Sequence, residues 1–570
     1  MTTIETAEPA PPESDDHASS PGTDARPHHG TVTVQPPKVL SSTDHKIIGQ
    51  LFLIGGLLGL LATVVVNLLV GIERVDGSTI AFDNSISQMF DAQRVGLVFG
   101  AALPLALALC IAVVPLQLGA RAIAFPRLAT LGFWLWFGGL VLNIVALASD
   151  GGTLGGSEDM VDLFIASLGL MAVGAVAAAM SIGATVLTTR APGMTMRRVP
   201  FFSWSALITS ITLVLVMPVF TGTLVYLFLD HRNSRTAFGG NAGFATWAGW
   251  LFTQPATYIF AIPAVGLFAE LLPANFRRRT PARGVMIFGL GLLGVAALGA
   301  VTQQNVARLP WAGSELNLDN LGNKVDDLVP FTYFNVLPLL GLFVVLLMAL
   351  ALIKPQKGIR PNITGALPFA LFGVGMIAVG MAGTVIYAID DLALQGTVFE
   401  EAVLIYVVYG AALAIMGGVV WWAPKLWGFA PATAKVVPLA LLGVLAIVLA
   451  AFPHFIAGFL DQPAGPVYDD DDLAIWNILV LVGHGLMALT LVAFIGLLAG
   501  ARRNRDRDDA VGDDPWDAQT LEWTTTSPAP GDNFVDVPIV HSAEPLLDLK
   551  AANRAANRAS NSASPDGSPA

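Results

Sequence analysis

The sequence predicts an all-α integral membrane protein with twelve transmembrane helices. Of its 570 residues, 54% are apolar and only 13% are charged, whereas about a quarter of the residues in an average soluble protein are charged. Roughly 20 apolar residues span a hydrocarbon core about 30 Å thick. Twelve stretches of that length occur between charged or Pro/Gly-rich breaks, near residues 47–70, 95–118, 128–148, 163–188, 202–229, 245–272, 284–305, 330–353, 363–389, 399–422, 436–460 and 473–500.

Lys and Arg are distributed unequally between the two sides of this predicted bundle. Short loops rich in Lys and Arg stay on the cytoplasmic side. With the N-terminus inside, the inner loops carry fourteen basic residues and the outer loops carry six. Further arginines follow the last span, at positions 502, 503, 505 and 507. Both termini are therefore predicted to be cytoplasmic.

The two ends of the chain differ in composition from the apolar region. Residues 1–44 are rich in Pro, Ser, Asp and Glu, without the basic n-region or cleavage site of a signal peptide, so we expect a disordered leader that is retained. We assign 45–500 to one transmembrane domain, 501–550 to a cytoplasmic tail and 551–570, rich in Ala, Asn and Ser, to a disordered end.

Cys110 has no partner for an intrachain disulfide. The net charge of −12 argues against nucleic acid as a partner.

Several short strings occur in the same order as in one known family. They are STDHKIIG at 42–49, GA at 119–120 with AFPR at 124–127 and FWL at 133–135, PFF at 200–202 with WS at 204–205, WAPK at 422–425, FPHF at 452–455, and DPW, TLEW, SPAP and NF between 514 and 534. They resemble strings of cytochrome c oxidase subunit I, a haem-copper respiratory oxidase. The resemblance implies a subunit I-like bundle in the plasma (inner) membrane of a bacterium. It also implies a lipid bilayer and respiratory-chain membrane subunits as partners.

The residues at the family's metal-binding positions differ from those of an active oxidase. The family holds a low-spin haem with two histidines and a high-spin haem facing a copper ion bound by three more. By this resemblance, the ligand positions hold Gln93, Gln254, Gln303, Gln304, Ala402 and Leu404. The register of the last two is open by one or two residues, but no histidine lies between His231 and His454. A carboxamide is a poor ligand for haem iron or copper, so we expect no haem, no copper or other metal, and no catalytic residue.

Other features that the resemblance would require are also changed. The sixth-helix motif keeps Tyr258 but has Ala256 in place of the proton-carrying glutamate. The arginines that pair with haem propionates correspond to the uncharged run at 462–466. The aspartate at the mouth of the family's proton path corresponds to Ala122, and its paired asparagines correspond to positions 129 and 130, which are Ala and Thr.

The four glutamines at ligand positions have two interpretations. They can fill space and pair with one another, with Tyr258 or with water, because an unsatisfied polar group in lipid costs several kcal/mol. Alternatively, they line a polar cavity that binds a ligand or passes protons, since polar clusters inside membranes often mark pathways. We favour the first interpretation.

The remaining candidate ligands are given structural roles. His454 and His484 are interpreted as satisfied packing or interfacial histidines, and His28 with His29 as solvated side chains in the leader. Glu400 and Glu401 are expected to cap the tenth helix, where the dipole favours negative charge, rather than to relay protons. The acidic run at 469–472 is interpreted as a solvated loop rather than as a cation or cytochrome site.

Three functions follow from these observations. The first is a non-catalytic, subunit I-like scaffold or accessory subunit of the aerobic respiratory chain. The second is an active terminal oxidase that oxidises cytochrome c, reduces oxygen and pumps protons, as family membership alone implies. The third is a proton or small-ligand transporter or sensor that uses a glutamine-lined cavity, which the scarcity of charged residues inside the helices disfavours.

Overall fold

The computed structural model describes residues 42–76, 85–253, 257–298, 328–353, 360–465, 472–504 and 511–563. This part of the chain is helical, and its only β-type pairing consists of isolated bridges such as Thr397 with Pro463. The predicted all-α class is confirmed. Eleven helices are long and apolar enough to cross a membrane within the described ranges. The chain is a multi-pass membrane protein.

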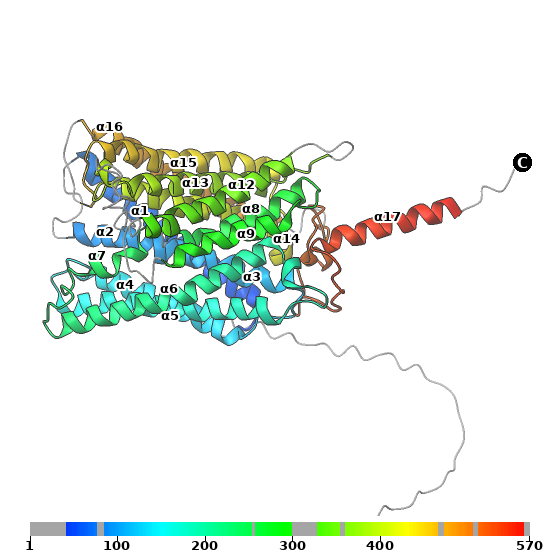
Figure 1. Cartoon of the computed structure of the whole chain (residues 1–570), viewed down its shortest axis with the longest axis horizontal. Coiled ribbons are helices and arrows are strands. Elements are labelled where there is room, and N and C mark those ends of the chain that lie inside the picture. Colours follow the sequence, from blue (N-terminus) through cyan, green and yellow to red (C-terminus); the bar gives the residue numbers. More distant parts are fainter. Residues whose placement is uncertain are drawn as a thin grey trace, which may run out of the picture. The chain divides into compact units, whose positions relative to one another are not determined.

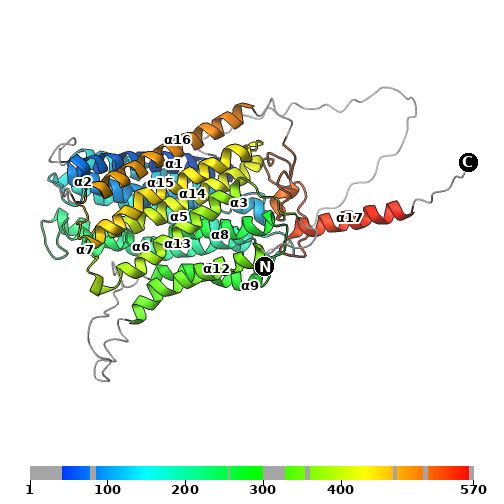
Figure 2. The same ribbon diagram turned by 90° about the horizontal axis from the view of Figure 1, so that it is seen from above.

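The long helices of this region run side by side (Figures 1 and 2). They are α1 (His45–Asp76), α2 (Ile86–Val95) continued by η2 (Gly96–Ala102) and α3 (Leu103–Leu118), α4 (Pro126–Ala148), α5 (Glu158–Thr188), α6 (Phe201–Arg232), α8 (Tyr258–Asn275), η7 (Thr332–Val336) continued by α12 (Leu337–Ile353), α13 (Ala366–Tyr387), α14 (Phe399–Trp427), α15 (Thr433–Phe459) and α16 (Ala474–Asn504). Shorter elements are η3 (Met196–Arg198), α7 (Phe244–Trp247), η4 (Gly249–Leu251), α9 (Arg283–Leu293), η5 (Gly294–Leu298), η8 (Asp390–Leu392), η9 (Leu521–Thr524) and α17 (Pro545–Ala563).

The twelfth predicted span corresponds to a shorter helix. The segment predicted at 284–305 begins as α9 and η5, an apolar helix over Arg283–Ala297. The rest of that segment lies in 299–327, outside the described residues. The count of twelve and the cytoplasmic placement of both termini therefore stay predictions.

Three helical segments form the centre of the bundle. The apolar spans of α2–α3, α8 and α14 are completely buried, whereas only about a third of the spans on α4 and η7–α12 is buried. Helices that are apolar all round are typical of a buried position, and the outer ones face lipid. The central helices are therefore those whose side chains can form an enclosed site.

Glycine allows two pairs of helices to approach closely. A Cβ on Gly132 of α4 would lie 2.7 Å from the carbonyl oxygen of Gly174 on α5, and the reverse distance is also 2.7 Å. Gly373 of α13 and Gly410 of α14 face each other in the same way, at 2.5 and 2.8 Å. Small residues at such crossings let backbones pack tightly in a membrane, where no hydrophobic force drives helices together.

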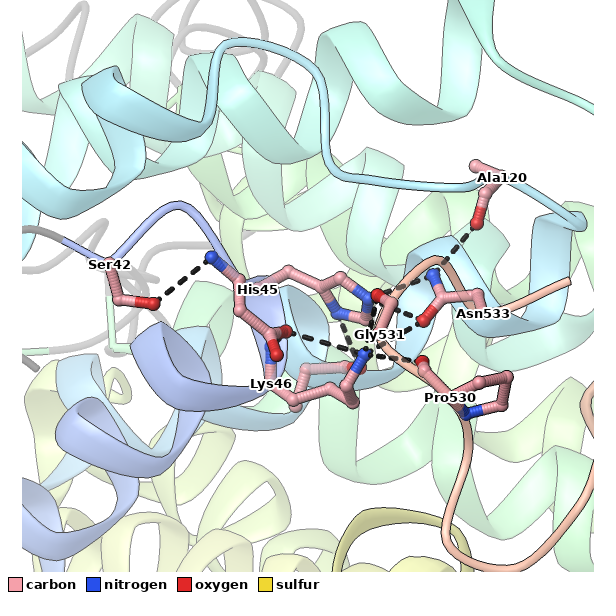
Figure 3. Close-up of polar contacts among 9 residues, drawn as sticks. Ser42, His45, Lys46, Ala120, Pro530, Gly531 and Asn533 are labelled. Carbon is pink, nitrogen blue, oxygen red and sulfur yellow. Dashed lines mark hydrogen bonds and ion pairs between the residues drawn. The ribbon is translucent and has the colours of Figure 1, made fainter. Parts of the chain in front are cut away.

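The tail is bound to the start of α1 through Asn533 (Figure 3). The Asn533 amide nitrogen donates to His45 Nε2 at 2.9 Å and to the Ala120 carbonyl at 2.8 Å, and its oxygen accepts from Lys46 Nζ at 3.0 Å. The second ring nitrogen of His45 lies 2.9 Å from the Ala112 carbonyl. Two of the strings that carry the family resemblance, at 42–49 and 533–534, thus hold each other in place.

A second contact joins the tail to the inner end of α14. Trp422 Nε1 and Gln117 Nε2 donate to the Oε1 atom of Glu522, at 3.2 and 3.3 Å. Lys425 Nζ donates to the Thr525 carbonyl at 2.5 Å. Glu522 is completely buried, and its Oε2 atom has no hydrogen bond among the described residues. Burial raises the pKa of Glu522.

Helical structure continues beyond the predicted tail boundary. We predicted disorder from residue 551, but α17 runs as far as Ala563. Ala has the highest helix propensity, and it recurs throughout 551–563. At the start of α17, Lys550 pairs with Asp514 at 2.5 Å and with Asp517 at 2.6 Å. Residues 564–570 lie outside the described residues, and the division of the chain at 500 and 550 stays a prediction.

Replacing Asn533 with Ala should release the tail from α1. Each buried partner left unpaired costs about 1–3 kcal/mol, so we expect a lower melting temperature and faster tryptic cleavage beyond residue 511. Asp536, which is exposed on the same segment, supplies the control Asp536→Ala. Equal melting temperatures and cleavage rates for the two variants would show that Asn533 does not hold the tail.

Replacing Glu522 with Gln should change how stability depends on pH. A carboxyl group whose folded pKa is raised loses stability as pH rises from its unfolded pKa, about 4.3, through the folded value. We expect Glu522→Gln to have a flatter dependence of melting temperature on pH and to gain stability relative to wild type at alkaline pH. The exposed Glu158 on α5 provides the control Glu158→Gln, which should follow the wild-type curve.

Candidate functional site

A buried ion pair joins the C-terminal end of α1 to the N-terminal end of α14, on the side of the bundle that the distribution of Lys and Arg predicts to be outer. Both guanidinium nitrogens of Arg74 donate to the Glu401 carboxylate, with distances of 2.9 Å to Oε2 and 2.8 Å to Oε1. The two side chains are only 3% and 7% exposed. This bidentate geometry is the strongest arrangement of an arginine with a carboxylate. Because each charge is buried, each depends on the other for stabilisation.

Backbone and amide groups extend this ion pair to neighbouring segments. The backbone nitrogen of Gly465 donates to Glu401 Oε1 at 3.3 Å. Asn477 on α16 donates to the Arg74 carbonyl at 3.4 Å and accepts from Gln462 Nε2 at 3.1 Å. The loop between α15 and α16 and the start of α16 are thereby connected to α1.

A second polar group lies deeper among the same helices. Asn67 Nδ2 on α1 donates to the Tyr409 hydroxyl on α14 at 2.9 Å, and this hydroxyl lies 3.1 Å from Nδ1 of His484 on α16. All three side chains are buried. The hydroxyl accepts from the amide nitrogen and lies within hydrogen-bond distance of the imidazole, whereas the Asn67 Oδ1 atom has no hydrogen bond among the described residues.

His454 lies between these two groups without a hydrogen bond to either. Both of its ring nitrogens are buried and have no hydrogen bond among the described residues. It lines a cavity of about 10 Å³ together with Asn67, Arg74, Gln93 and His484, among others. A space of this size holds about one water molecule. A bound water is the group that would satisfy His454.

Gln93 and Leu404 face a common small space. Gln93 comes from α2 and Leu404 from α14, and both line a second cavity of about 10 Å³ with Arg94, Glu400 and Glu401. Ala402, two residues before Leu404 and so on another side of α14, is completely buried. The structure thus places Gln93 and Leu404, two of the six positions that the resemblance assigns to family ligands, around one small space.

Of the other predicted site residues, the structure describes only Tyr258. Gln254, Gln303 and Gln304 lie outside the described residues. Tyr258, at the start of α8, is buried, and its hydroxyl has no hydrogen bond among the described residues. The predicted pairing of the glutamines with Tyr258 stays a prediction.

Comparison with known proteins gives the family. Residues 47–302 match the family described as "Cytochrome C and Quinol oxidase polypeptide I". Cytochrome c oxidase subunit 1 of Bacillus subtilis is 28% identical over 540 residues, which cover 89% of this chain and 82% of the relative. Cytochrome bo(3) ubiquinol oxidase subunit 1 of Buchnera aphidicola is 28% identical over 487 residues, which cover 80% and 70%.

The chain is a subunit I-like protein of the haem-copper oxidases. This assignment confirms the resemblance, including its extent beyond the first half of the chain, since the relatives align over most of it. The eleven apolar helices of the described region agree with a subunit I-like membrane fold. Whether this chain can bind a haem must be judged from its own residues.

The space between Gln93 and Leu404, which the resemblance assigns to family ligand positions, does not fit a haem. An amide and an alkyl group face each other where two imidazoles would be needed. The space is about 10 Å³, whereas pockets for small ligands are roughly 300 Å³ or larger. Among the described residues, no group of three or more His, Cys, Asp or Glu side chains is placed to hold a metal ion. The copper positions lie outside these residues and are not tested.

Three sequence interpretations need correction. Glu400 and Glu401 do lie in the first turn of α14, but neither makes a capping hydrogen bond; Glu400 accepts from Tyr387 at 2.9 Å, and Glu401 pairs with Arg74. His454 is buried rather than interfacial, and no protein group satisfies it in the described region. Arg74 was counted with an outer loop, but α1 continues through it to Asp76.

The sequence analysis missed Arg74, Asn67 and Tyr409 as members of one cluster. A charged residue directly after an apolar span is ordinarily assigned to a loop, which hid Arg74. A better signal was available in Asn67, because a buried amide within a transmembrane span requires a partner. The partner itself, Tyr409, is 342 positions away and could not be identified from spacing.

The ion pair predicts a strong coupling between Arg74 and Glu401. Arg74→Met and Glu401→Gln each leave one unpaired buried charge, and we expect each to cost about 3–5 kcal/mol. The double variant Arg74→Met with Glu401→Gln should recover most of that loss, as judged by unfolding in detergent. Asp159→Asn, which removes an exposed partner of Arg232, should cost less than about 1 kcal/mol. Additive effects of the two single changes would contradict the coupling.

Proposed function

We propose that this subunit I-like protein is a non-catalytic component of an aerobic respiratory-chain membrane assembly, acting as a scaffold or accessory subunit in a bacterial plasma membrane. The main support is the space between Gln93 and Leu404, which offers no imidazole and holds about one water molecule. The neighbouring Arg74–Glu401 pair fills the adjoining region with two charges that compensate each other. A large macrocycle would have to separate them.

The Arg74–Glu401 pair and the groups bonded to it also connect several segments of the bundle. They connect α1, α14, α16 and the loop that contains Gly465. In the family, a haem would bridge helices in the same part of the bundle, according to the resemblance. A network of hydrogen bonds that joins these helices can stabilise the fold without a cofactor, provided that its buried polar groups are satisfied.

A proton or ligand transporter is less well supported. Between Gln93 and Gln117, α2 to α3 carries no ionisable or amide side chain apart from Arg94 and Cys110. That stretch is about 36 Å long. On α6, the hydroxyls of Ser205, Thr209 and Ser210 each donate to a carbonyl of their own helix. The outer cluster and the Glu522 contact at the inner end are therefore not joined along these helices.

Oxygen consumption tests the absence of activity. Membranes of a host without its own terminal oxidases, expressing this chain alone, should consume oxygen no faster than membranes with an empty vector, using reduced cytochrome c or quinol as donor. Expression of an active oxidase subunit I with its partners provides the positive control. Oxygen reduction sensitive to cyanide and dependent on this chain would refute the proposal.

Introducing histidine at positions 93 and 404 tests whether haem binding is prevented by missing ligands or by missing space. We expect the double variant Gln93→His with Leu404→His to remain without stoichiometric haem, because the side chains around Glu401 occupy the volume. The measurement is the haem-to-protein ratio after purification from cells supplied with excess haem. One haem per chain in this variant would show that the space is available and that only the ligands are missing.

Co-purification tests the scaffold role. A tagged chain, extracted in mild detergent from its native membrane, should retain other respiratory-chain membrane subunits. An unrelated tagged multi-pass protein from the same membrane gives the background. Recovery of the chain without such subunits would argue against an accessory role while leaving its lack of catalysis unaffected.

A further inference from the structure

An open groove of about 670 Å³ lies between α1 and α16 and reaches the residues that follow α14. On α1 it is lined by Gln50, Leu53, Ile54, Leu57 and Leu58. The spacing of these residues places them on one face of the helix. Ile54 and Leu58 are each 56% exposed, so this face is directed outward to lipid rather than packed in the bundle. The lining from Gln50 to Leu58 extends about 12 Å along α1.

The wall formed by α16 changes from apolar to positively charged along the groove. Ile495, Leu498 and Ala499 lie beside the leucines of α1, and Arg502 and Arg503 follow in the last turn of α16. With 31 residues, α16 is about 46 Å long, which exceeds a hydrocarbon thickness of about 30 Å. Its last turns diverge from the neighbouring helices and stand apart from the bundle (Figure 2). The two arginines therefore reach the level of the lipid headgroups.

Aromatic residues mark the same level on the third side of the groove. Trp427 ends α14, and its ring stacks on Phe429 with the centroids 5.8 Å apart. Trp is enriched where hydrocarbon meets the headgroup region. Gln50, Trp427 and the two arginines thus surround one end of the groove with polar and amphipathic groups, and the other end is purely aliphatic.

We propose that this groove binds one glycerophospholipid with an anionic headgroup. The phosphate lies against Arg502 and Arg503, and one acyl chain lies against the aliphatic faces of α1 and α16. Guanidinium groups bind phosphate in a bidentate manner. No ion pair joins either arginine to an acidic side chain among the described residues, which exclude 505–510. By the distribution of Lys and Arg, this end faces the cytoplasmic leaflet, where basic side chains attract anionic lipids.

The charges decide between a lipid and other apolar occupants. A quinone has no anionic group for two arginines to bind. An apolar helix of another chain would cover Ile54 and Leu58 but would leave the guanidinium groups unpaired. Asp506, Asp508 and Asp509 follow α16 in the sequence, and their pairing with the arginines is the alternative that the experiment must exclude.

Native mass spectrometry of the full chain tests the proposal with phosphatidylglycerol and phosphatidylcholine as probes. The wild-type protein should retain one phosphatidylglycerol and prefer it over phosphatidylcholine by on the order of tenfold or more, since each basic residue near the headgroups adds to the attraction. Arg502→Gln with Arg503→Gln should abolish this preference. Arg121→Gln with Arg127→Gln is the matched control, because both arginines are exposed at the same end of the bundle but outside the groove.

A third variant tests the aliphatic half of the groove separately. Ile54→Trp fills the space beside α1 without changing any charge, and it should prevent retention of the phosphatidylglycerol. If the Arg121/Arg127 control also lost its preference for phosphatidylglycerol, the preference would come from general surface charge and not from a binding site, which would contradict the proposal. Unchanged preference in the Arg502/Arg503 variant, as expected if the following aspartates already neutralise these arginines, would overturn the proposal. Retention by Ile54→Trp would do so too.

Discussion

Two opposite charges buried between α1 and α14 impose the main constraint on this protein. Arg74 and Glu401 are almost completely removed from solvent, and an isolated charge in such a place is very unfavourable. Each must therefore stay within hydrogen-bond distance of the other, which fixes the outer ends of the two helices. Gly465 and Asn477 then attach the loop after α15 and the start of α16 to the same pair.

This constraint also limits what else the outer half of the bundle can contain. Gln93, Leu404 and the ion pair surround spaces of about one water molecule each. In an oxidase of this family the same helices would have to separate around a macrocycle. Here, amide, hydroxyl and imidazole groups are bonded to one another, as in the triplet of Asn67, Tyr409 and His484. Such a network is favourable in a membrane only when its members are satisfied, and the cavity beside His454 has room for one water molecule that could bond to it.

The sequence was sufficient for the architecture because that part of the problem is local. Each span is recognisable from its own 20 or so residues. The predicted span at 284–305 corresponds, among the described residues, to a shorter apolar helix over Arg283–Ala297. Some of the strings that carried the resemblance contact one another: the string at 42–49 binds Asn533, and Trp422 binds Glu522. They mark positions where the tail docks onto the bundle.

The site was less predictable because it depends on contacts between distant segments. Arg74 and Glu401 are 327 positions apart, and nothing in the spacing of either residue identifies the other. Glu401 looked like a helix cap because its local position suits one, and a tertiary partner overrode that role. Gln93 and Leu404 line one small cavity, and the resemblance could not indicate how little space lies between them. Their assignment to ligand positions stays a prediction.

The most direct test of the account is the cofactor content of the wild-type chain purified from its native membrane. Absorption spectroscopy and metal analysis together give the number of haems and copper ions per chain. The account predicts no Soret band and far less than one haem and one copper ion per chain. Two haems and a copper ion at full occupancy would contradict it.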